Sequence, residues 1–140
     1  RNLSELHAHT QATQQPLPEL LQKVAENPNY NTMVHIIIKN ELPVGKFISN
    51  VRSGHLFSIV NEAMANTVRH AHAQNVTIET HDLGEFLQIR IRDDGQGFPP
   101  EVKNGYGLRN MRDRARLLNG KILFENDKGL VVTLEIPWKD

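Results

Sequence analysis

Two pairs of alternating segments do most to restrict the fold of this 140-residue chain. Residues 75–82 (NVTIETHD) and 85–93 (EFLQIRIRD) alternate apolar and polar side chains across a short Leu-Gly connection. Residues 121–126 (KILFEN) and 130–138 (LVVTLEIPW) repeat this arrangement around Asp-Lys-Gly. Alternation interrupted by short turns is typical of β-hairpins. The chain should therefore build a mixed, mostly antiparallel sheet.

Helical segments separate these strands. Apolar residues recur with helical spacing in residues 17–25, 53–71 and 108–119, with Ser53 expected to cap the second helix. The β-branched run at residues 33–38 (MVHIII) predicts one more strand. This order of elements favours an α+β fold, a two-layer α/β sandwich with the helices on one face of the sheet.

The polar, glutamine-rich residues 1–16 predict a tail or linker, which leaves 17–140 as the folded domain. The first residue is arginine, which suggests a piece of a longer protein. Sixteen basic residues balance sixteen acidic ones, so the sequence offers no electrostatic reason to bind nucleic acid or a membrane surface. The absence of cysteine excludes disulfides and thiolate metal sites and suits a reducing compartment.

The helix at 53–71 carries a polar arc beside its apolar stripe. Glu62 and Asn66 lie four residues apart and so share one helix face, with Arg69 and His70 one turn further along. Asparagine is a poor residue for a helix interior. Oxygen ligands for a hard cation such as Mg²⁺ would explain it, although an ordinary solvated face would fit the residues equally well. The stripe expected to pack on the sheet consists of Leu56, Val60, Ala63, Met64, Thr67 and Ala71.

Residues 94–107 form a predicted loop with two glycine pairs, Gly95/Gly97 and Gly105/Gly107. Glycine allows positive φ and a close approach between backbone and ligand. The second pair immediately precedes a helix, whose first N–H groups can bind phosphate oxygens. Neither pair matches a P-loop or a dinucleotide-binding fingerprint. Either pair alone could be a turn, and a phosphate-binding loop of another kind stays open.

Taken in order, NEAMANTVRHA (61–71), DDGQGF (93–98) and GYGLRNMRDRA (105–115) resemble the N, G1 and G2 boxes of the GHKL ATPases. That superfamily includes DNA gyrase, MutL, heat-shock chaperones and histidine kinases. The residues of these boxes are most similar to those of sensor histidine kinases that pair with NarL-type response regulators. The resemblance covers roughly residues 17–138 and implies the Bergerat fold, which is a two-layer α/β sandwich.

The resemblance implies an ATP site in which Asp93 accepts a hydrogen bond from the adenine 6-amino group and selects adenine over guanine. Gly95 and Gly97 would let the purine lie against the backbone, and Asp94 is left as a turn acid. The ATP lid would begin at Phe98. Its phosphate side, also assigned to nucleotide binding, would consist of Gly105, Tyr106, Gly107 and Leu108.

By the same resemblance, Asn66 is the Mg²⁺ ligand and Glu62 is the catalytic carboxylate that orients the attacking group. Arg69 and His70 would approach the phosphates. The implied reaction transfers the γ-phosphoryl group of ATP to a histidine on a separate dimerisation domain of the same protein, for passage to a response regulator. The domain would be cytoplasmic, without contact to nucleic acid or membrane, while membrane anchoring of the whole protein is left open. An anti-sigma-type serine kinase and a degenerate nucleotide-binding module are the alternatives.

Two departures from the family pattern stand out. Relatives carry Gly-Thr where this chain has Gly129 and Leu130, and the threonine hydroxyl helps to hold a water between adenine and the aspartate. Thr133 should not replace it, because strand alternation places residues 130 and 133 on opposite faces. Neither His7 nor His9 is followed by an acid, so we expect the phosphoacceptor histidine to lie outside this chain.

Overall fold

The computed structural model describes residues 14–43, 45–97 and 107–139. One layer is a five-stranded sheet with the spatial order β2-β4-β5-β7-β6. Only β2 and β4 pair in parallel, and the other neighbours in this sheet are antiparallel. The predicted mixed, mostly antiparallel sheet is therefore confirmed. Its strands are β2 (His35–Asn40), β4 (Asn75–Asp82), β5 (Phe86–Asp93), β6 (Lys121–Asn126) and β7 (Leu130–Pro137).

Both predicted hairpins form. Ile78 pairs with Ile91 between β4 and β5, and Ile122 pairs with Leu134 between β6 and β7. Ile78, Ile91 and Leu134 are buried, whereas the residues next to them on each strand are mostly more exposed. The alternation in the sequence thus separates a face in contact with the helices from an open face. Each fully buried Leu or Ile side chain contributes roughly 1.5–3 kcal/mol.

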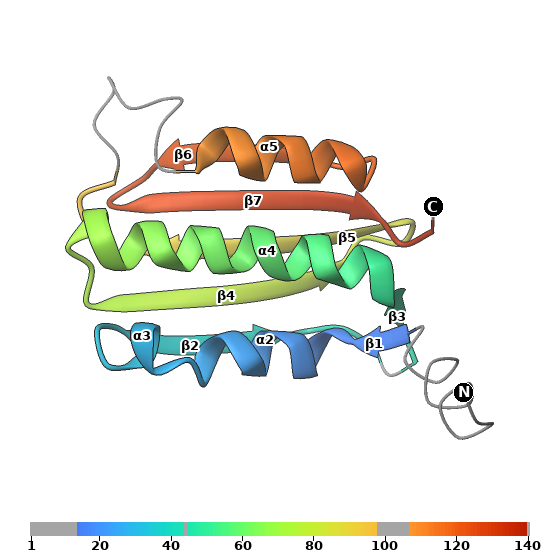
Figure 1. The fold of residues 1–140 in the computed structure, drawn as a ribbon, viewed down its shortest axis with the longest axis horizontal. Helices are drawn as coiled ribbons and strands as arrows, with labels where there is room; N and C mark the ends of the chain where they lie inside the picture. Colours follow the sequence, from blue (N-terminus) through green and yellow to red (C-terminus); the bar gives the residue numbers. More distant parts are fainter. Residues whose placement is uncertain (1–13, 44, 98–106, 140) are drawn as a thin grey trace, which may run out of the picture.

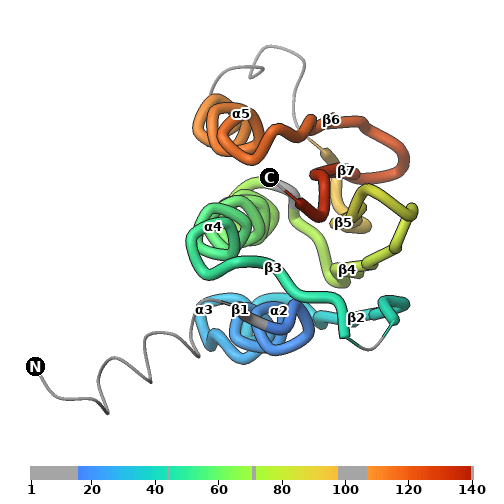
Figure 2. Tube along the Cα trace, turned by 90° about the vertical axis from the view of Figure 1, so that its right-hand side faces the viewer, coloured from blue at the N-terminus to red at the C-terminus, as the bar shows by residue number. Residues whose placement is uncertain are grey.

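Three helices lie side by side on one face of the sheet, as Figures 1 and 2 show from two directions: α2 (Leu17–Ala25), α4 (Asn50–Asn66) and α5 (Leu108–Leu117). The predicted stripe of α4 is buried from Leu56 to Thr67, while the side chain of Ala71 lies outside the described residues. Within the described part of the chain, no helix has the length and apolar character that crossing a bilayer requires.

The start of α4 differs from the prediction. The helix begins at Asn50, and Ser49 caps it by accepting a hydrogen bond from the Arg52 backbone N–H at 3.4 Å. Ser53 is buried inside the first turns, where its hydroxyl donates to the Asn50 carbonyl at 2.9 Å. A serine hydroxyl satisfies either a cap or the preceding turn. Because the short strand β3 (Phe47–Ser49) runs directly into the helix, Ser49 rather than Ser53 takes the N-cap position.

The segment before the sheet is more ordered than its composition suggested. β1 (Gln14–Pro16) pairs antiparallel with β3, so the predicted tail at 1–16 ends within a strand, and residues 1–13 lie outside the described residues. α2 ends at Ala25, as predicted, and a second short helix follows it. Asn27 caps a further turn, α3 (Pro28–Asn31), because its side chain accepts a hydrogen bond from the Asn29 N–H at 2.9 Å. β2 begins two residues later than the predicted strand at 33–38.

The elements of interest meet at one edge of the sandwich. α4 continues there into a π-helical turn, η1 (Thr67–Ala71). Next to this turn lie the end of β5, the turn from β6 to β7 and the start of α5 (Figure 1). The described parts of the three sequence boxes, which are far apart along the chain, therefore converge on this edge.

Candidate nucleotide-binding site

The carboxylate of Asp93, at the end of β5, is buried with 3% of the residue exposed. Its Oδ1 accepts hydrogen bonds from the backbone N–H groups of Gly95 at 2.9 Å and Leu130 at 3.1 Å. Its Oδ2 accepts a hydrogen bond from the Thr67 hydroxyl at 3.1 Å. These donors compensate the desolvation of the carboxylate. Since each carboxylate oxygen has two lone pairs, the described residues leave one acceptor position, and it lies on Oδ2.

Two glycines allow the chain to close around this carboxylate. Gly129 has φ of 129°, and a Cβ at this position would overlap the backbone carbonyl oxygen of Asp93. Gly97 has φ of 73°, and a Cβ there would overlap the side chain of Asn126. Gly95 contributes its N–H to Asp93. Gly129 was not predicted as a site residue, although its position directly before Leu130 could have indicated it.

The polar arc of α4 gathers at the same edge. The Arg69 guanidinium donates to Asn66 Oδ1 at 3.3 Å and lies 3.9 Å from Glu62 Oε1. Asn66 is fully buried, and its amide nitrogen has no hydrogen-bond partner among the described residues. Burial and the neighbouring Arg69 lower the pKa of His70 below its usual value of 6.5, so His70 is neutral at pH 7. At pH 7 the positive charge of this cluster is therefore carried by Arg69 and not by His70.

The start of α5 lies against Glu62. Gly107 is the N-cap, with φ of 79° and no side-chain cap, and a Cβ there would overlap the Glu62 carboxylate. A carboxylate beside a helix N-terminus interacts favourably with the helix dipole. Leu108 is buried in the core, so only its backbone can face a ligand. The other predicted lid residues, Phe98, Gly105 and Tyr106, lie outside the described residues.

The donor set is compatible with a hard cation bound together with phosphates. In the described residues, no group of three or more His, Cys, Asp or Glu could form a protein-only metal site. Glu62 and Asn66 instead provide two oxygen-bearing side chains in contact with one guanidinium. Mg²⁺ commonly takes one or two protein oxygens and completes its shell with phosphate oxygens and water. The Asn66 amide nitrogen, which has no partner among the described residues, is a donor and suits a phosphate oxygen rather than the cation itself.

Tyr30 is a neighbour of this cluster that the sequence gave no reason to select. Its hydroxyl donates to the Asn61 carbonyl at 3.2 Å, which joins α3 to α4 one residue before Glu62. Burial raises the pKa of Tyr30, and the Glu62 carboxylate raises it further. The hydroxyl therefore keeps its proton at neutral pH and holds the polar face of α4 in place.

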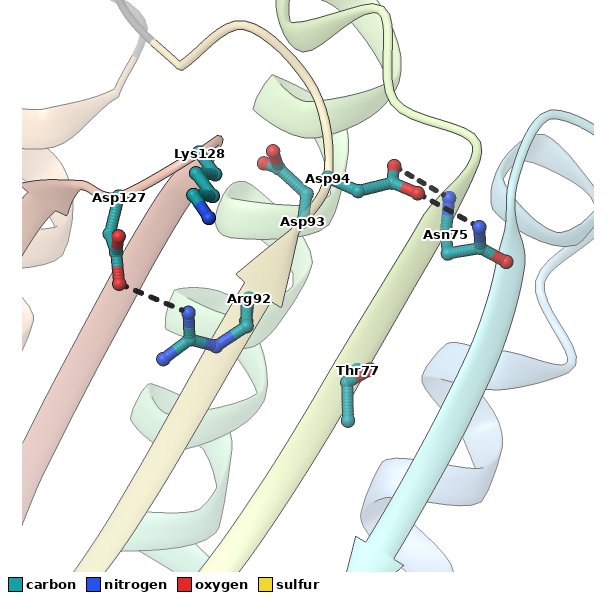
Figure 3. Close-up of a pocket in the computed structure, with 7 residues that line it drawn as sticks. All are labelled: Asn75, Thr77, Arg92, Asp93, Asp94, Asp127 and Lys128. Atoms are coloured by element: carbon teal, nitrogen blue, oxygen red, sulfur yellow. Dashed lines mark hydrogen bonds and ion pairs between the residues drawn. The ribbon is translucent and has the colours of Figure 1, made fainter.

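Asp94, which the resemblance left as a turn acid, bonds to residues at the start of another strand. It accepts hydrogen bonds from the N–H of Gln74 at 2.8 Å, and from the N–H and side-chain amide of Asn75 at 2.9 and 2.8 Å (Figure 3). These contacts fasten the end of β5 to the start of β4. The donors from Asn75 lower the pKa of Asp94 below its usual value of 3.8.

A hollow of about 350 Å³ lies on the open face of the sheet at this edge, lined among others by Thr77 and Arg92. Arg92 is paired there with Asp127 at 3.5 Å (Figure 3). Asp93 and Asp94 line the same hollow. The Asp93 carboxylate also bonds to Thr67 in the helical layer, so the end of β5 contacts both sides of the sheet.

Comparison with known proteins identifies the family of this chain. Residues 52–140 match the family described as histidine kinase-, DNA gyrase B-, and HSP90-like ATPase. The chain belongs to this ATPase family. The identity predicted from the three boxes is therefore confirmed, whereas pairing with a NarL-type response regulator stays a prediction.

Curated relatives are longer than this chain. The sensor protein VraS of Staphylococcus saprophyticus is 42% identical over 85 residues, which are 59% of this chain and 23% of that protein. VraS of Staphylococcus aureus is 46% identical over 63 residues, which are 44% of this chain and 18% of that protein. The chain thus spans about a quarter or less of the length of these relatives.

Solved structures show the same fold. The catalytic domain of the histidine kinase ThkA superposes with a TM-score of 0.75 at 19% identity, covering 89% of this chain and 94% of that one. The ATP-binding domain of PrrB from Mycobacterium tuberculosis gives 0.71 at 22% identity, covering 89% and 96%. The predicted Bergerat-type sandwich is therefore confirmed.

Gly129→Ala should lower the free energy of unfolding by more than the strain of a non-glycine residue at positive φ. The new Cβ overlaps the Asp93 carbonyl, which is backbone and cannot turn aside. Gly84→Ala is the matched control, because Gly84 also has positive φ (94°) but faces open space. We expect Gly84→Ala to lower the free energy of unfolding by about 1 kcal/mol, and Gly129→Ala by about 2 kcal/mol more. Equal urea midpoints for the two variants would contradict the close packing described.

Asp94→Ala should reduce stability at neutral pH and have little effect in acid. A carboxylate whose pKa is lowered on folding stabilises the protein above its unfolded pKa, and this contribution is lost as the pH falls through the folded value. Because Asp94 is exposed, we expect a loss of only about 0.5 kcal/mol at pH 7. Urea midpoints of variant and parent at pH 7 and pH 3 measure it. A difference that persists undiminished at pH 3 would refute the assignment.

Proposed function

We propose that this chain is the ATP-binding catalytic domain of a sensor histidine kinase. It would transfer the γ-phosphoryl group of Mg-ATP to a histidine on a separate dimerisation domain of the same protein, for onward passage to a response regulator. The observation that carries this proposal is the single remaining acceptor position on the buried Asp93 carboxylate, at an edge shared with Glu62 and Asn66. The sensor proteins among the relatives support it.

Adenine selection follows from the hydrogen-bonding capacity of Asp93. The adenine 6-amino group donates, and the free position on Oδ2 can accept one such hydrogen bond. Guanine has a carbonyl oxygen at the same ring position, which would face a carboxylate without any proton between them. An unsatisfied pair of acceptors in a buried site costs the full desolvation of both groups. The site should therefore prefer ATP to GTP.

The phosphates would lie toward Glu62, Asn66 and Arg69. Asn66 would hold Mg²⁺ through its carboxamide oxygen, and the ion would supply neutralisation of the phosphate charge. Arg69, whose side chain is 56% exposed, is free to turn from Asn66 toward the phosphates. Glu62 would orient the attacking group, and the first N–H groups of α5 would face the anion. Phosphoryl transfer needs mainly positioning and charge stabilisation of this kind.

Asp93→Asn should remove most of the ATP affinity while leaving the fold intact. The amide oxygen can still accept from Gly95 and Leu130, but the amide nitrogen turns a donor toward the adenine 6-amino group. We expect at least a tenfold (~1.4 kcal/mol) loss in affinity by calorimetry. Asp82→Asn, at the opposite end of β4 from the site, is the control and should bind ATP like the parent. Unchanged binding by Asp93→Asn would rule out the adenine site proposed.

Asn66→Ala should abolish Mg²⁺-dependent transfer. The domain would be mixed with Mg-ATP and the separately produced dimerisation domain of its parent protein, and acid-labile phosphate on the latter would be measured. We expect transfer by the parent domain and by the exposed control Asn29→Ala, and at least a tenfold slower transfer by Asn66→Ala. Tight Mg-ATP binding without any phosphate on the dimerisation domain would contradict the histidine kinase assignment.

A further inference from the structure

The departure at Leu130 raises the question of which residue supplies the hydroxyl next to adenine. Leu130 is buried, and its side chain belongs to the apolar core. Only its backbone N–H reaches the site, where it donates to Asp93 Oδ1. Position 130 therefore helps to hold the carboxylate but provides no hydroxyl.

A hydroxyl reaches Asp93 from the opposite layer instead. Thr67 is buried, and its hydroxyl donates to Asp93 Oδ2 at 3.1 Å. It is the first residue of the π-helical turn η1 and follows Asn66 directly. Turns of this kind are frequent at functional sites. Here both Asn66 and Thr67 are buried, although they are consecutive residues of a helix.

The two carboxylate oxygens of Asp93 differ in their hydrogen-bond partners. Oδ1 is filled by Gly95 and Leu130, so its orientation is fixed by backbone groups. Among the residues that the structure describes, Oδ2 has one partner, Thr67, and keeps one free position. The Thr67 oxygen, having donated its proton, keeps two lone pairs that can accept a hydrogen bond from water. Oδ2 and the Thr67 oxygen thus form an adjacent pair of acceptors at the adenine end.

We propose that Thr67 is the positioning residue of the adenine subsite and takes over the hydroxyl function that Leu130 lacks. It fixes Oδ2 toward the 6-amino group and accepts a hydrogen bond from the water beside the adenine ring. This inference rests on the proposed function, since it requires adenine at Asp93. A purely structural Thr67 would only satisfy a buried carboxylate and would not affect which purine is bound.

The test compares ATP with purine riboside triphosphate, which lacks the 6-amino group, by calorimetry on the whole chain. Thr67→Val keeps the shape but removes the hydroxyl, which leaves Asp93 held through Oδ1 alone. We expect ATP affinity to fall about tenfold and affinity for the analogue to fall less than about threefold. Thr67→Ser should stay within about threefold of the parent for both nucleotides. An equal loss for the two nucleotides in Thr67→Val would overturn the proposal.

Thr80→Val is the matched control. Thr80 is also buried, and its hydroxyl donates to Asn40 Oδ1 at 2.6 Å; it pairs with Ile89 of β5, four residues before Asp93. Its removal should lower stability without changing the preference for ATP over the analogue. A change in that preference equal to the one in Thr67→Val would show that loss of any buried hydroxyl produces the effect, and would overturn the proposal.

Leu130→Thr keeps the inference testable even if Thr67→Val does not fold. If Thr67 already supplies the hydroxyl, Leu130→Thr in the parent should raise ATP affinity by less than about threefold. In the Thr67→Val background it should recover at least about threefold. A gain of about tenfold in the parent would mean that the hydroxyl was missing, and Thr67 would have no such role.

Failure of the proposed function would look different. In that case the parent itself would bind ATP no more tightly than the analogue, and Asp93→Asn would change neither affinity. A parent that prefers ATP, with variants at Thr67 that retain the preference, would instead leave the ATP site in place and refute only the role of Thr67.

Discussion

The buried carboxylate of Asp93 is the interaction on which this edge of the sandwich depends. Its donors come from the end of the helical layer, from its own loop and from the first residue of β7. A buried carboxylate without donors costs several kcal/mol, so these segments must assemble together. Folding therefore produces an oriented acceptor before any ligand arrives, which is the condition for selective recognition of a purine edge.

The periodicity of the sequence predicted those features that depend only on residues close together in the chain. Alternation located both hairpins, and helical spacing placed Glu62, Asn66 and Arg69 on one side of α4, because these relationships do not depend on the rest of the fold. Strands of three residues such as β1 are too short to alternate visibly. The choice between Ser49 and Ser53 as cap was equally hidden, since it depends on where β3 enters the helix.

The contacts that complete the site join residues distant in sequence, which periodicity cannot locate. Tyr30 meets the carbonyl of Asn61, and Gly129 meets the backbone of Asp93. Thr67 was assigned to the apolar stripe, and it is buried as expected. Its methyl group suits that stripe, whereas its hydroxyl faces the carboxylate. A β-branched polar residue thus satisfies a packing pattern and a chemical role simultaneously, and only the tertiary structure separates the two.

The π-helical turn limits how this protein can change. Asn66 and Thr67 are neighbours in sequence, yet one lies in the cluster with Arg69 and the other on Asp93. Two consecutive residues, rather than a loop of adjustable length, therefore set the distance between the contacts proposed for the phosphate end and the adenine end of the ligand. Insertion or deletion of a single residue in this turn would displace both contacts together. A change in nucleotide preference that keeps both contacts would therefore have to come from exchange of side chains rather than from a change in the length of the turn.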